Sequence, residues 1–395
     1  MSVMAAGSLS AMRMFAGMIG KLPAGQLWYL YRRMRNEKPH RFAGQIRVNT
    51  FFPPYPSMAF DRFRDAVVAR RRVPLSAYLA VTHACPYSCR HCSVSGRPDA
   101  APPGEALLDV VEQIKGLGTC TLGLTGGEPL LREDLEELIA AAGPEMATIV
   151  FTTGVGLDAA RARRLAEANV TCVTVGIESD DPSVHDAVRG GGGSFAAAAE
   201  AARNCDAAGV YTAVSTVGTR ERMADGSLER MYAVATAWGA REFRVLAPVA
   251  TGRRAGCAAF MLTDEERRRL ADFHVRHNRD RREPAVACFA YLESGEVFGC
   301  GAGYHHLYVD AAGNVCPCDL TPLAFGSVGD EPLADVWERM ASHFARPRVG
   351  CLMGALAGEI DADADLPLPR EQSERLCPRA REGDPLPEGY RRLLG

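Results

Sequence analysis

The 395-residue sequence lacks the features of several large protein classes. It contains no apolar run of about 18 residues, the length that a membrane-spanning helix requires. Its N-terminus has no compact apolar segment with a small-residue cleavage site, so we expect no secretory signal. Its net charge is −3, whereas nucleic-acid-binding proteins are normally basic. These absences predict a cytoplasmic protein that does not bind nucleic acid.

Cysteine, by contrast, is abundant, with 13 residues in the chain. In a reducing compartment such residues are thiols and metal ligands rather than disulfides. Cys85, Cys89 and Cys92 lie on one short loop after the apolar run 75–82. Three thiolates this close in sequence can converge on one soft metal centre. Because tetrahedral zinc or a [4Fe–4S] cluster takes four protein ligands, three leave one position open.

Alternating strand and helix patterns begin at residue 77. Strand-like runs lie at 77–83, 120–125, 148–153, 171–178, 211–219 and 243–250. Helical patterns lie near 105–116, 132–142, 158–168, 194–208, 227–238 and 263–278. The alternation predicts a parallel sheet with outer helices, either an open doubly wound sheet or a partial barrel. In both, ligands bind at the carboxyl ends of the strands, where the cysteine loop also lies.

The other predicted strands end in small and polar residues at the same rim. Gly126 and Gly127 let the backbone approach a ligand closely, and Glu128 adds a carboxylate. Later strand ends carry Thr153, Glu178, Ser215 and Val249. Each of these turns alone is typical of any strand–helix connection. Their shared position at one rim is what indicates a site.

The motifs CxxxCxxC at Cys85–Cys92 and Gly-Gly-Glu-Pro at 126–129 together resemble the radical S-adenosylmethionine (SAM) superfamily over residues 77–260. The resemblance implies an α/β fold with a partial (β/α)6 TIM-like barrel and a [4Fe–4S] cluster whose open iron chelates SAM. It implies reductive cleavage of SAM to a 5′-deoxyadenosyl radical that abstracts hydrogen from a substrate C–H bond. It also implies a flavodoxin- or ferredoxin-type reductant.

By position, the resemblance assigns the SAM amino group to Gly126–Glu128 and the ribose and carboxylate region to Glu178. The expected SAM-binding residues are Gly126, Gly127, Glu128, Thr153, Glu178, Ser215 and Val249. Two positions depart from the family pattern. Gly176 stands where relatives usually have serine, and His91 replaces the more usual aromatic hydrocarbon ring.

The C-terminal third carries a second group of cysteines. Cys300, Gly313 and Cys318 form a CX12GX4C pattern, in which 307–315 predicts a β-hairpin that brings the two cysteines together. Cys351 and Cys377 follow. The pattern resembles the SPASM/twitch extension but lacks its CxxC-x5-C-x3-C group, so we expect one auxiliary [4Fe–4S] cluster on Cys300, Cys318, Cys351 and Cys377. Cys288 and Cys316 compete as ligands, and structural zinc is the alternative.

Four regions follow from these patterns. They are a basic amphipathic segment and Pro-rich linker (1–76), the barrel (77–262), a connecting helix (263–285) and a small Cys-rich α+β auxiliary domain (286–395). Residues 1–60 carry eight basic residues against Glu37, and Pro23 divides two amphipathic stretches. Residues 1–36 are therefore an interfacial segment at the inner membrane surface, a helix pair packed on the barrel, or a flexible basic arm.

The expected activity is hydrogen abstraction from a large substrate of the peptide or natural-product maturation type, with the auxiliary cluster as an electron relay. A membrane-associated lipid, isoprenoid or tetrapyrrole is the alternative substrate. An Fe–S electron carrier and a zinc-stabilised binding module are the non-enzymatic alternatives. Tyr304 and His305, on the auxiliary hairpin, are candidates for proton transfer. The sequence does not identify the substrate.

Overall fold

The computed structural model describes residues 4–5, 13–280, 284–361 and 364–394. At its centre is a nine-stranded sheet in the order β10-β9-β8-β7-β6-β5-β4-β11-β12. Neighbouring strands from β10 to β11 are parallel, and β12 is antiparallel to β11. In chain order, the six strands of the barrel are β4 (Ser76–Thr82), β5 (Thr121–Gly126), β6 (Ala147–Thr152), β7 (Cys172–Gly176), β8 (Thr212–Val217) and β9 (Glu242–Leu246).

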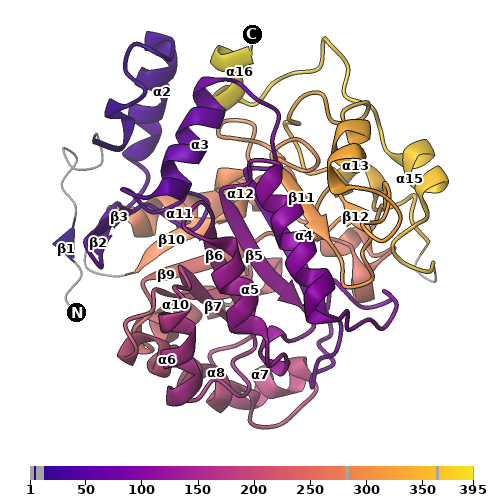
Figure 1. Cartoon of the computed structure of the whole chain (residues 1–395). Coiled ribbons are helices and arrows are strands. Elements are labelled where there is room, and N and C mark those ends of the chain that lie inside the picture. Colours follow the sequence, from indigo (N-terminus) through magenta and orange to yellow (C-terminus); the bar gives the residue numbers. More distant parts are fainter. Residues whose placement is uncertain (1–3, 6–12, 281–283, 362–363, 395) are drawn as a thin grey trace.

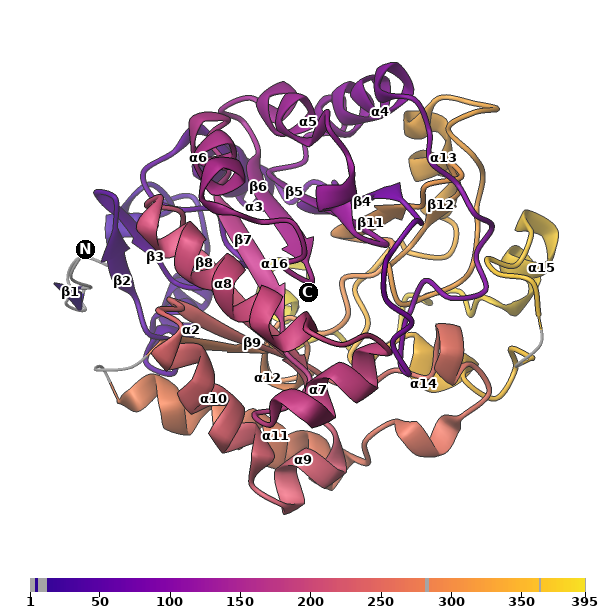
Figure 2. The same ribbon diagram turned by 90° about the horizontal axis from the view of Figure 1, so that it is seen from below.

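The sheet curves, and helices cover its outer face (Figure 2). They are α4 (Gly104–Gly116), α5 (Leu135–Ala142), α6 (Ala159–Glu167), α7 (Pro182–Arg189), α8 (Ser194–Ala207), α9 (Arg220–Ala224), α10 (Ser227–Ala237) and α11 (Asp264–Arg279). Outward side chains such as Leu79, Leu122 and Val173 are buried in the core beneath them. The α/β fold class with its partial TIM-like barrel is confirmed. The short helices α7 and α9 were not predicted.

The inside of the curved sheet combines glycine with large side chains, among them Tyr78, Phe151 and Arg244. Gly123 on β5 is the clearest case, because a Cβ there would lie 2.4 Å from the Tyr78 ring and 3.0 Å from the Phe151 ring. The two rings pack with their centroids 5.0 Å apart in front of the glycine. A larger residue at position 123 would displace both rings, so this glycine fixes the packing of the barrel interior.

The N-terminal segment forms a small sheet and two helices that pack on the barrel. They are β1 (Met4–Ala5), β2 (His40–Phe42), β3 (Gln45–Arg47), α2 (Ala24–Met34) and α3 (Met58–Val68). Helix α2 begins directly after Pro23, as predicted. Figure 1 shows α2 and α3 with the C-terminal helix α16 (Glu388–Leu394) at the end of the barrel where the strands begin. Among the described helices, none is both long and apolar enough to cross a bilayer.

The chain after α11 extends the sheet at both edges. Strand β10 (Ala285–Cys288) pairs with β9, and β11 (His306–Val309) pairs with β4. Strand β12 (Val315–Cys316) completes the predicted hairpin. Strand β10 was not predicted, because four apolar residues are too few to distinguish a strand from a buried helical turn. The remaining helices are α12 (Phe289–Leu292), α13 (Leu333–Met340), α14 (Met353–Leu356) and α15 (Arg370–Leu376).

A buried ion pair joins the cysteine loop to the C-terminal hairpin. Arg97 Nη1 donates to Asp310 Oδ2 at 2.9 Å, and the two side chains are 1% and 0% exposed. The guanidinium also lies over the Tyr308 ring, 5.1 Å from its centroid. Asp310 accepts hydrogen bonds from the main-chain N–H groups of Ala312 and Asn314 and thereby closes the hairpin turn. One carboxylate therefore stabilises both the turn and the contact between the two regions.

We expect Asp310→Ala to lower the free energy of unfolding by about 3–5 kcal/mol, because it leaves the Arg97 charge buried without its partner. Urea denaturation of the two proteins measures the difference. Arg164→Ala is the control, since Arg164 pairs with Glu136 at 3.1 Å while 53% exposed, and its loss should cost less than about 1 kcal/mol. Equal effects of the two substitutions would contradict this reading of the buried pair.

Candidate active site

The loop that carries Cys85, Cys89 and Cys92 links β4 to α4 at the carboxyl end of the barrel. Main-chain hydrogen bonds hold it against two neighbouring segments. Ser88 N–H donates to Arg189 O at 2.8 Å, and Arg253 N–H donates to Cys92 O at 3.0 Å. All three cysteines are half-buried and free. The loop is thus fixed at both sides while its thiols stay accessible from the rim.

The three thiols share one electrostatic environment. Burial raises the pKa of Cys85, and the neighbouring Glu128, Cys89 and Cys92 raise it further. Burial also raises the pKa of Cys89, while Arg189 opposes this shift with Nη1 3.7 Å from the sulfur. A bound cation would remove the mutual repulsion of three thiolates, since thiolate is the metal-binding form. The donor set fits an iron–sulfur cluster with one open iron.

Two glycines let the loop approach the end of β5. Gly127 N–H donates to Thr82 O at 2.7 Å, and a Cβ on Gly127 would lie 2.1 Å from Ala84 O. Gly126 has a φ of +122°, which disfavours other residues. On the other side of the loop, a Cβ on Gly252 would lie 2.1 Å from Cys92 O. The cysteine loop is therefore in contact with main chain at positions where no side chain fits.

Glu128 is fully buried, and its carboxylate is engaged within the protein. It accepts hydrogen bonds from the Thr152 hydroxyl at 2.7 Å, from Thr153 N–H at 2.7 Å and from Leu130 N–H at 3.0 Å. Burial raises its pKa, and these donors counteract the shift. The side chain thus joins the ends of β5 and β6. The N–H groups of Gly127 and Glu128 are also engaged, since they donate to Thr82 O and Ala84 O.

Glu178 is the centre of a charged cluster beside the cysteine loop. Its carboxylate, 6% exposed, lies 3.1 Å from Arg189 Nη2, 3.3 Å from Arg222 Nη2 and 3.4 Å from His91 Nε2. Burial alone would raise its pKa, but His91 and the guanidinium groups bring it well below its usual range. Glu178 is therefore ionised at neutral pH, and His91, the departure from the family pattern, has a polar partner that a hydrocarbon ring would lack.

Arg189 explains the second departure from the family pattern. A Cβ on Gly176 would lie 2.3 Å from Arg189 Nη2, so the guanidinium occupies the space that a serine side chain would need. Arg189 is buried on α7 between Glu178 and Cys89. The sequence analysis did not assign Arg189 or Arg222 to the site. The signal for Arg189 was its place in His185-Asp-Ala-Val-Arg189-Gly190, directly after the β7 rim.

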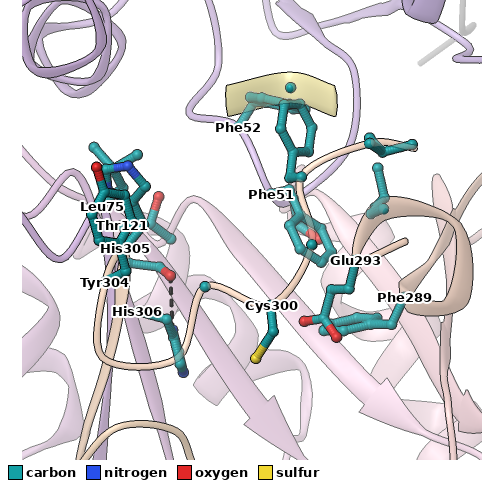
Figure 3. A pocket seen from close by; sticks show the side chains of 18 of the residues that line it. Phe51, Phe52, Leu75, Thr121, Phe289, Glu293, Cys300, Tyr304, His305 and His306 are labelled. Atoms are coloured by element: carbon teal, nitrogen blue, oxygen red, sulfur yellow. Dashed lines mark hydrogen bonds between the residues drawn. The ribbon is translucent and has the colours of Figure 1, made fainter. Parts of the chain in front are cut away.

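A cavity of about 400 Å³ connects the barrel interior with the second group of cysteines. Ser215 and Val249 line it at the barrel rim, and Cys300, Cys318 and Cys351 line its other end. Phe51, Phe52 and Phe289 give it a largely apolar wall (Figure 3). The residues that line it do not include Gly126, Gly127, Glu128, Thr153 or Glu178, which lie at the rim beside the cysteine loop.

Three of the four expected auxiliary ligands come together at the far end of the cavity. The pKa of Cys300 is raised well above its usual value, first by a hydrogen bond with the Cys351 thiol and then by burial. Burial also raises the pKa of Cys318, to which Asp319 and Cys300 contribute. Cys377 lies elsewhere, with its sulfur 3.8 Å from Pro378 O. Three thiols that line one end of the same cavity again fit an iron–sulfur cluster.

The competing cysteines, Cys288 and Cys316, make other contacts. Cys288 Sγ lies 3.5 Å from Leu270 O. Cys316 Sγ lies 3.7 Å from Arg97 Nη1, on the side of the hairpin that faces the cysteine loop. Both thiols are fully buried, as is typical of cysteines that act as packing residues.

Tyr304 and His305 line the cavity wall across from Phe51 and Phe52 (Figure 3). The centroids of their rings lie 4.3 Å apart. His305 Nδ1 lies 3.0 Å from Val73 O, and burial lowers the His305 pKa to about 4, so the ring is neutral at pH 7. Burial raises the pKa of Tyr304. Both side chains reach the cavity in their uncharged forms, and their role in proton transfer stays a prediction.

We expect Gly127→Ala to slow SAM cleavage about ten- to a hundredfold, because overpacking costs ~1–3 kcal/mol and here displaces the cysteine loop. The rate of 5′-deoxyadenosine formation and the iron content after anaerobic reconstitution measure the effect. Gly192→Ala is a matched control, since a Cβ there meets nothing within 4 Å. A Gly127→Ala protein as active as Gly192→Ala would show that this close approach is not needed.

Known proteins share these features. A family model described as "Radical SAM superfamily" matches residues 79–225, and one described as "Iron-sulfur cluster-binding domain" (SPASM) matches residues 300–351. A PqqA peptide cyclase of Streptomyces rochei is 30% identical over 290 residues, which cover 67% of this chain and 75% of that protein. An AdoMet-dependent heme synthase of Nitratidesulfovibrio vulgaris is 24% identical over 295 residues, which cover 68% of this chain and 79% of that protein.

The fold is also similar to that of SuiB from Streptococcus suis. The SuiB structure with S-adenosylmethionine has a TM-score of 0.60 at 17% identity and covers 75% of this chain and 79% of SuiB. The SuiB structure with its precursor peptide SuiA has a TM-score of 0.57 at 16% identity, covering 83% and 77%. Together with the geometry of the two thiol sites, these matches identify the chain as an enzyme that belongs to the radical SAM superfamily and carries a C-terminal SPASM iron–sulfur domain.

Proposed function

We propose that this enzyme abstracts a hydrogen atom from a C–H bond of a peptide bound in the cavity, and that the auxiliary site accepts the electron of the resulting substrate radical. The observation that carries the proposal is the cavity itself. It extends from the barrel rim to Cys300, Cys318 and Cys351, so a bound substrate would contact both ends. A volume of about 400 Å³ is within the usual range for small-molecule sites and fits one or two side chains of a longer substrate.

At the rim, Cys85, Cys89 and Cys92 would hold the [4Fe–4S] cluster, and SAM would occupy its open position. Bound there, a reduced cluster would supply the electron that cleaves SAM to methionine and a 5′-deoxyadenosyl radical. The main chain of 126–128 would bind the amino group. Ser215 and Val249 would line the pocket that directs the adenosyl group toward the cavity.

The charged cluster beside the loop would orient the rest of SAM. Arg189 lies between Glu178 and Cys89, which suits it to bind the carboxylate of SAM next to the cluster. Glu178 would hold this guanidinium in place and offer its remaining lone pairs to the ribose hydroxyls. Its low pKa keeps it an acceptor across the physiological range. A flavodoxin- or ferredoxin-type protein of the cytoplasm would supply the electron.

The peptide is proposed on two grounds. The relatives include a peptide cyclase, and the apolar wall of the cavity suits side chains such as those of aromatic or aliphatic residues. Tyr304 and His305 would lie beside such a side chain. As a neutral imidazole, His305 is able to accept the proton that substrate oxidation releases.

The proposal predicts that hydrogen moves from a peptide into 5′-deoxyadenosine. The reconstituted enzyme is incubated with SAM, a reductant and a fully deuterated peptide fraction from cells of the organism that encodes it. A parallel incubation contains a deuterated lipid extract of the same cells instead of the peptide fraction. Deuterium in 5′-deoxyadenosine from the peptide fraction is the expected result, measured by mass spectrometry. Transfer from the lipid extract alone would overturn the peptide proposal, and Cys85→Ala, which removes a cluster ligand, should abolish the product in both.

A membrane-associated substrate is the second candidate, favoured by an exposed patch on the N-terminal segment. Ile19, Trp28 and Tyr31 are 68%, 58% and 42% exposed, and the two aromatic rings stack at 5.5 Å. Arg32 and Arg35 lie nearby in the sequence. Aromatic and basic residues together are typical of segments that bind anionic lipid headgroups. A heme synthase among the relatives is compatible with a tetrapyrrole substrate.

For this second candidate, we expect Trp28→Ala/Tyr31→Ala to weaken sedimentation with phosphatidylserine-containing liposomes several-fold while leaving SAM cleavage unchanged, because the substituted rings are on the surface. Val184→Ala is the matched control, since Val184 is 49% exposed on α7. If the wild-type protein does not sediment with these liposomes, the patch has another role.

A further inference from the structure

The auxiliary site has one ligand fewer than a [4Fe–4S] cluster takes. Such a cluster has four iron atoms, each of which needs one ligand from outside the cluster. At the far end of the cavity the structure brings together the thiols of Cys300, Cys318 and Cys351. The fourth position must be filled by another side chain or by a ligand from solution.

Cys377 is poorly placed for this role. It is buried between α15 and the following proline, and its carbonyl accepts a hydrogen bond from His343 Nδ1 at 3.1 Å. Burial raises its pKa to about 12, and the charged group that acts on it is Arg348 rather than one of the three thiols. The Arg348 guanidinium in turn donates to Pro378 O. These contacts fix Cys377 in the packed core of the extension.

Glu293 lies where the fourth ligand is needed. It ends helix α12, seven residues before Cys300, and lines the cavity. Figure 3 shows its carboxylate beside the Cys300 thiol. Within the described part of the chain, this half-buried carboxylate accepts no hydrogen bond. A carboxylate that has lost part of its hydration without gaining a donor is destabilised unless it binds a cation.

The groups that act on the Glu293 pKa also place its carboxyl near the thiols. Burial raises the pKa of its carboxyl to about 8, Cys300 and Asp319 add to the shift, and Arg267 opposes it. The same carboxyl acts on the pKa of Cys318. Glu293 is thus close to two of the three thiols.

Asp319 is the other carboxylate at this end of the cavity, but it already has partners. Its Oδ1 lies 3.3 Å from His306 Nε2 and 3.3 Å from Cys318 Sγ. His306 Nδ1 lies 2.8 Å from the Ser76 hydroxyl. His306, Cys318 and Asp319 offer ligand atoms within 4.8 Å of one another, but the contacts among them already engage the Asp319 carboxylate. Glu293 has no such hydrogen-bonded partner among the described residues.

We propose that Glu293, and not Cys377, binds the fourth iron of the auxiliary cluster, which is then held by three thiolates and one carboxylate. The inference rests on the proposed auxiliary cluster. Oxygen ligands bind iron of this kind less tightly than thiolates do, because thiolate is the softer donor. The iron on Glu293 is consequently the one that leaves first on oxidation, and the one at which a substrate group from the cavity can replace a protein ligand.

The experiment uses the full chain with Cys85, Cys89 and Cys92 replaced by alanine, so that the auxiliary cluster is observed alone. After anaerobic reconstitution this parent should contain about four iron atoms per chain. One equivalent of ferricyanide accepts one electron as [4Fe–4S]²⁺ releases Fe²⁺ and becomes [3Fe–4S]⁺. The expected result is about three iron atoms and the electron paramagnetic resonance signal of the three-iron cluster.

Four further variants in the same background separate the alternatives. Glu293→Ala and Glu293→Gln leave three thiolates and should lose the fourth iron to ferricyanide faster than the parent does, whereas Glu293→Cys should keep about four iron atoms after ferricyanide, because it supplies a fourth thiolate. Cys377→Ala should behave as the parent does. So should Glu296→Ala, a control on the same loop whose side chain is 83% exposed.

Two results would overturn the inference, and they are distinguishable. If Cys377→Ala loses iron while Glu293→Ala and Glu293→Gln keep about four atoms, Cys377 is the ligand and the proposed function stands. If the parent itself binds no iron and sulfide, the auxiliary cluster and its relay role are wrong, and the inference fails with them. Recovery of four stable iron atoms in Glu293→Cys would show that any loss in Glu293→Ala is not a folding defect.

Discussion

The site depends on a steric constraint: at particular positions inside the barrel and at its rim, a glycine leaves the space that a neighbouring group occupies. Gly123 leaves room for the Tyr78 and Phe151 rings, Gly127 for the main chain of the cysteine loop, and Gly176 for the Arg189 guanidinium. Gly123 lies within β5, Gly127 directly follows β5, and Gly176 ends β7; the outward residues of these strands are large and apolar. The same strands therefore bury a core on one face and leave space for ligands on the other.

Titratable groups gather at both ends of this space, at the barrel rim and at the auxiliary site. At the rim, the carboxylate of Glu178 is surrounded by Arg189, Arg222 and His91, so it remains ionised and the positive groups keep fixed positions. At the far end, burial and the neighbouring groups raise the pKa values of Cys300 and Glu293, which favours their neutral, protonated forms. Metal binding there would release protons, because thiolate and carboxylate are the forms that bind a cation.

Sequence patterns predicted the six barrel strands, their main helices and the auxiliary hairpin, because each is long or has a marked hydrophobic period. They did not predict β10, whose four residues have no measurable period, or α7 and α9, which are short. Within the site, the cysteines and the 126–129 motif stood out by spacing. Arg189, Arg222 and Glu293 did not, because a single charged residue in a loop or helix has no pattern, and its position relative to the thiols exists only in the folded chain.

The Arg97–Asp310 pair has a further consequence for the two thiol sites. Arg97 lies five residues after Cys92, and Asp310 lies between Cys300 and Cys318. A buried, charge-assisted contact of 2.9 Å therefore holds the two cysteine-bearing loops at a constant separation. Electron tunnelling slows steeply as the gap between donor and acceptor widens. With a cluster at each site, this ion pair would keep the distance between the two clusters, and hence the rate of electron transfer between them, the same in every turnover.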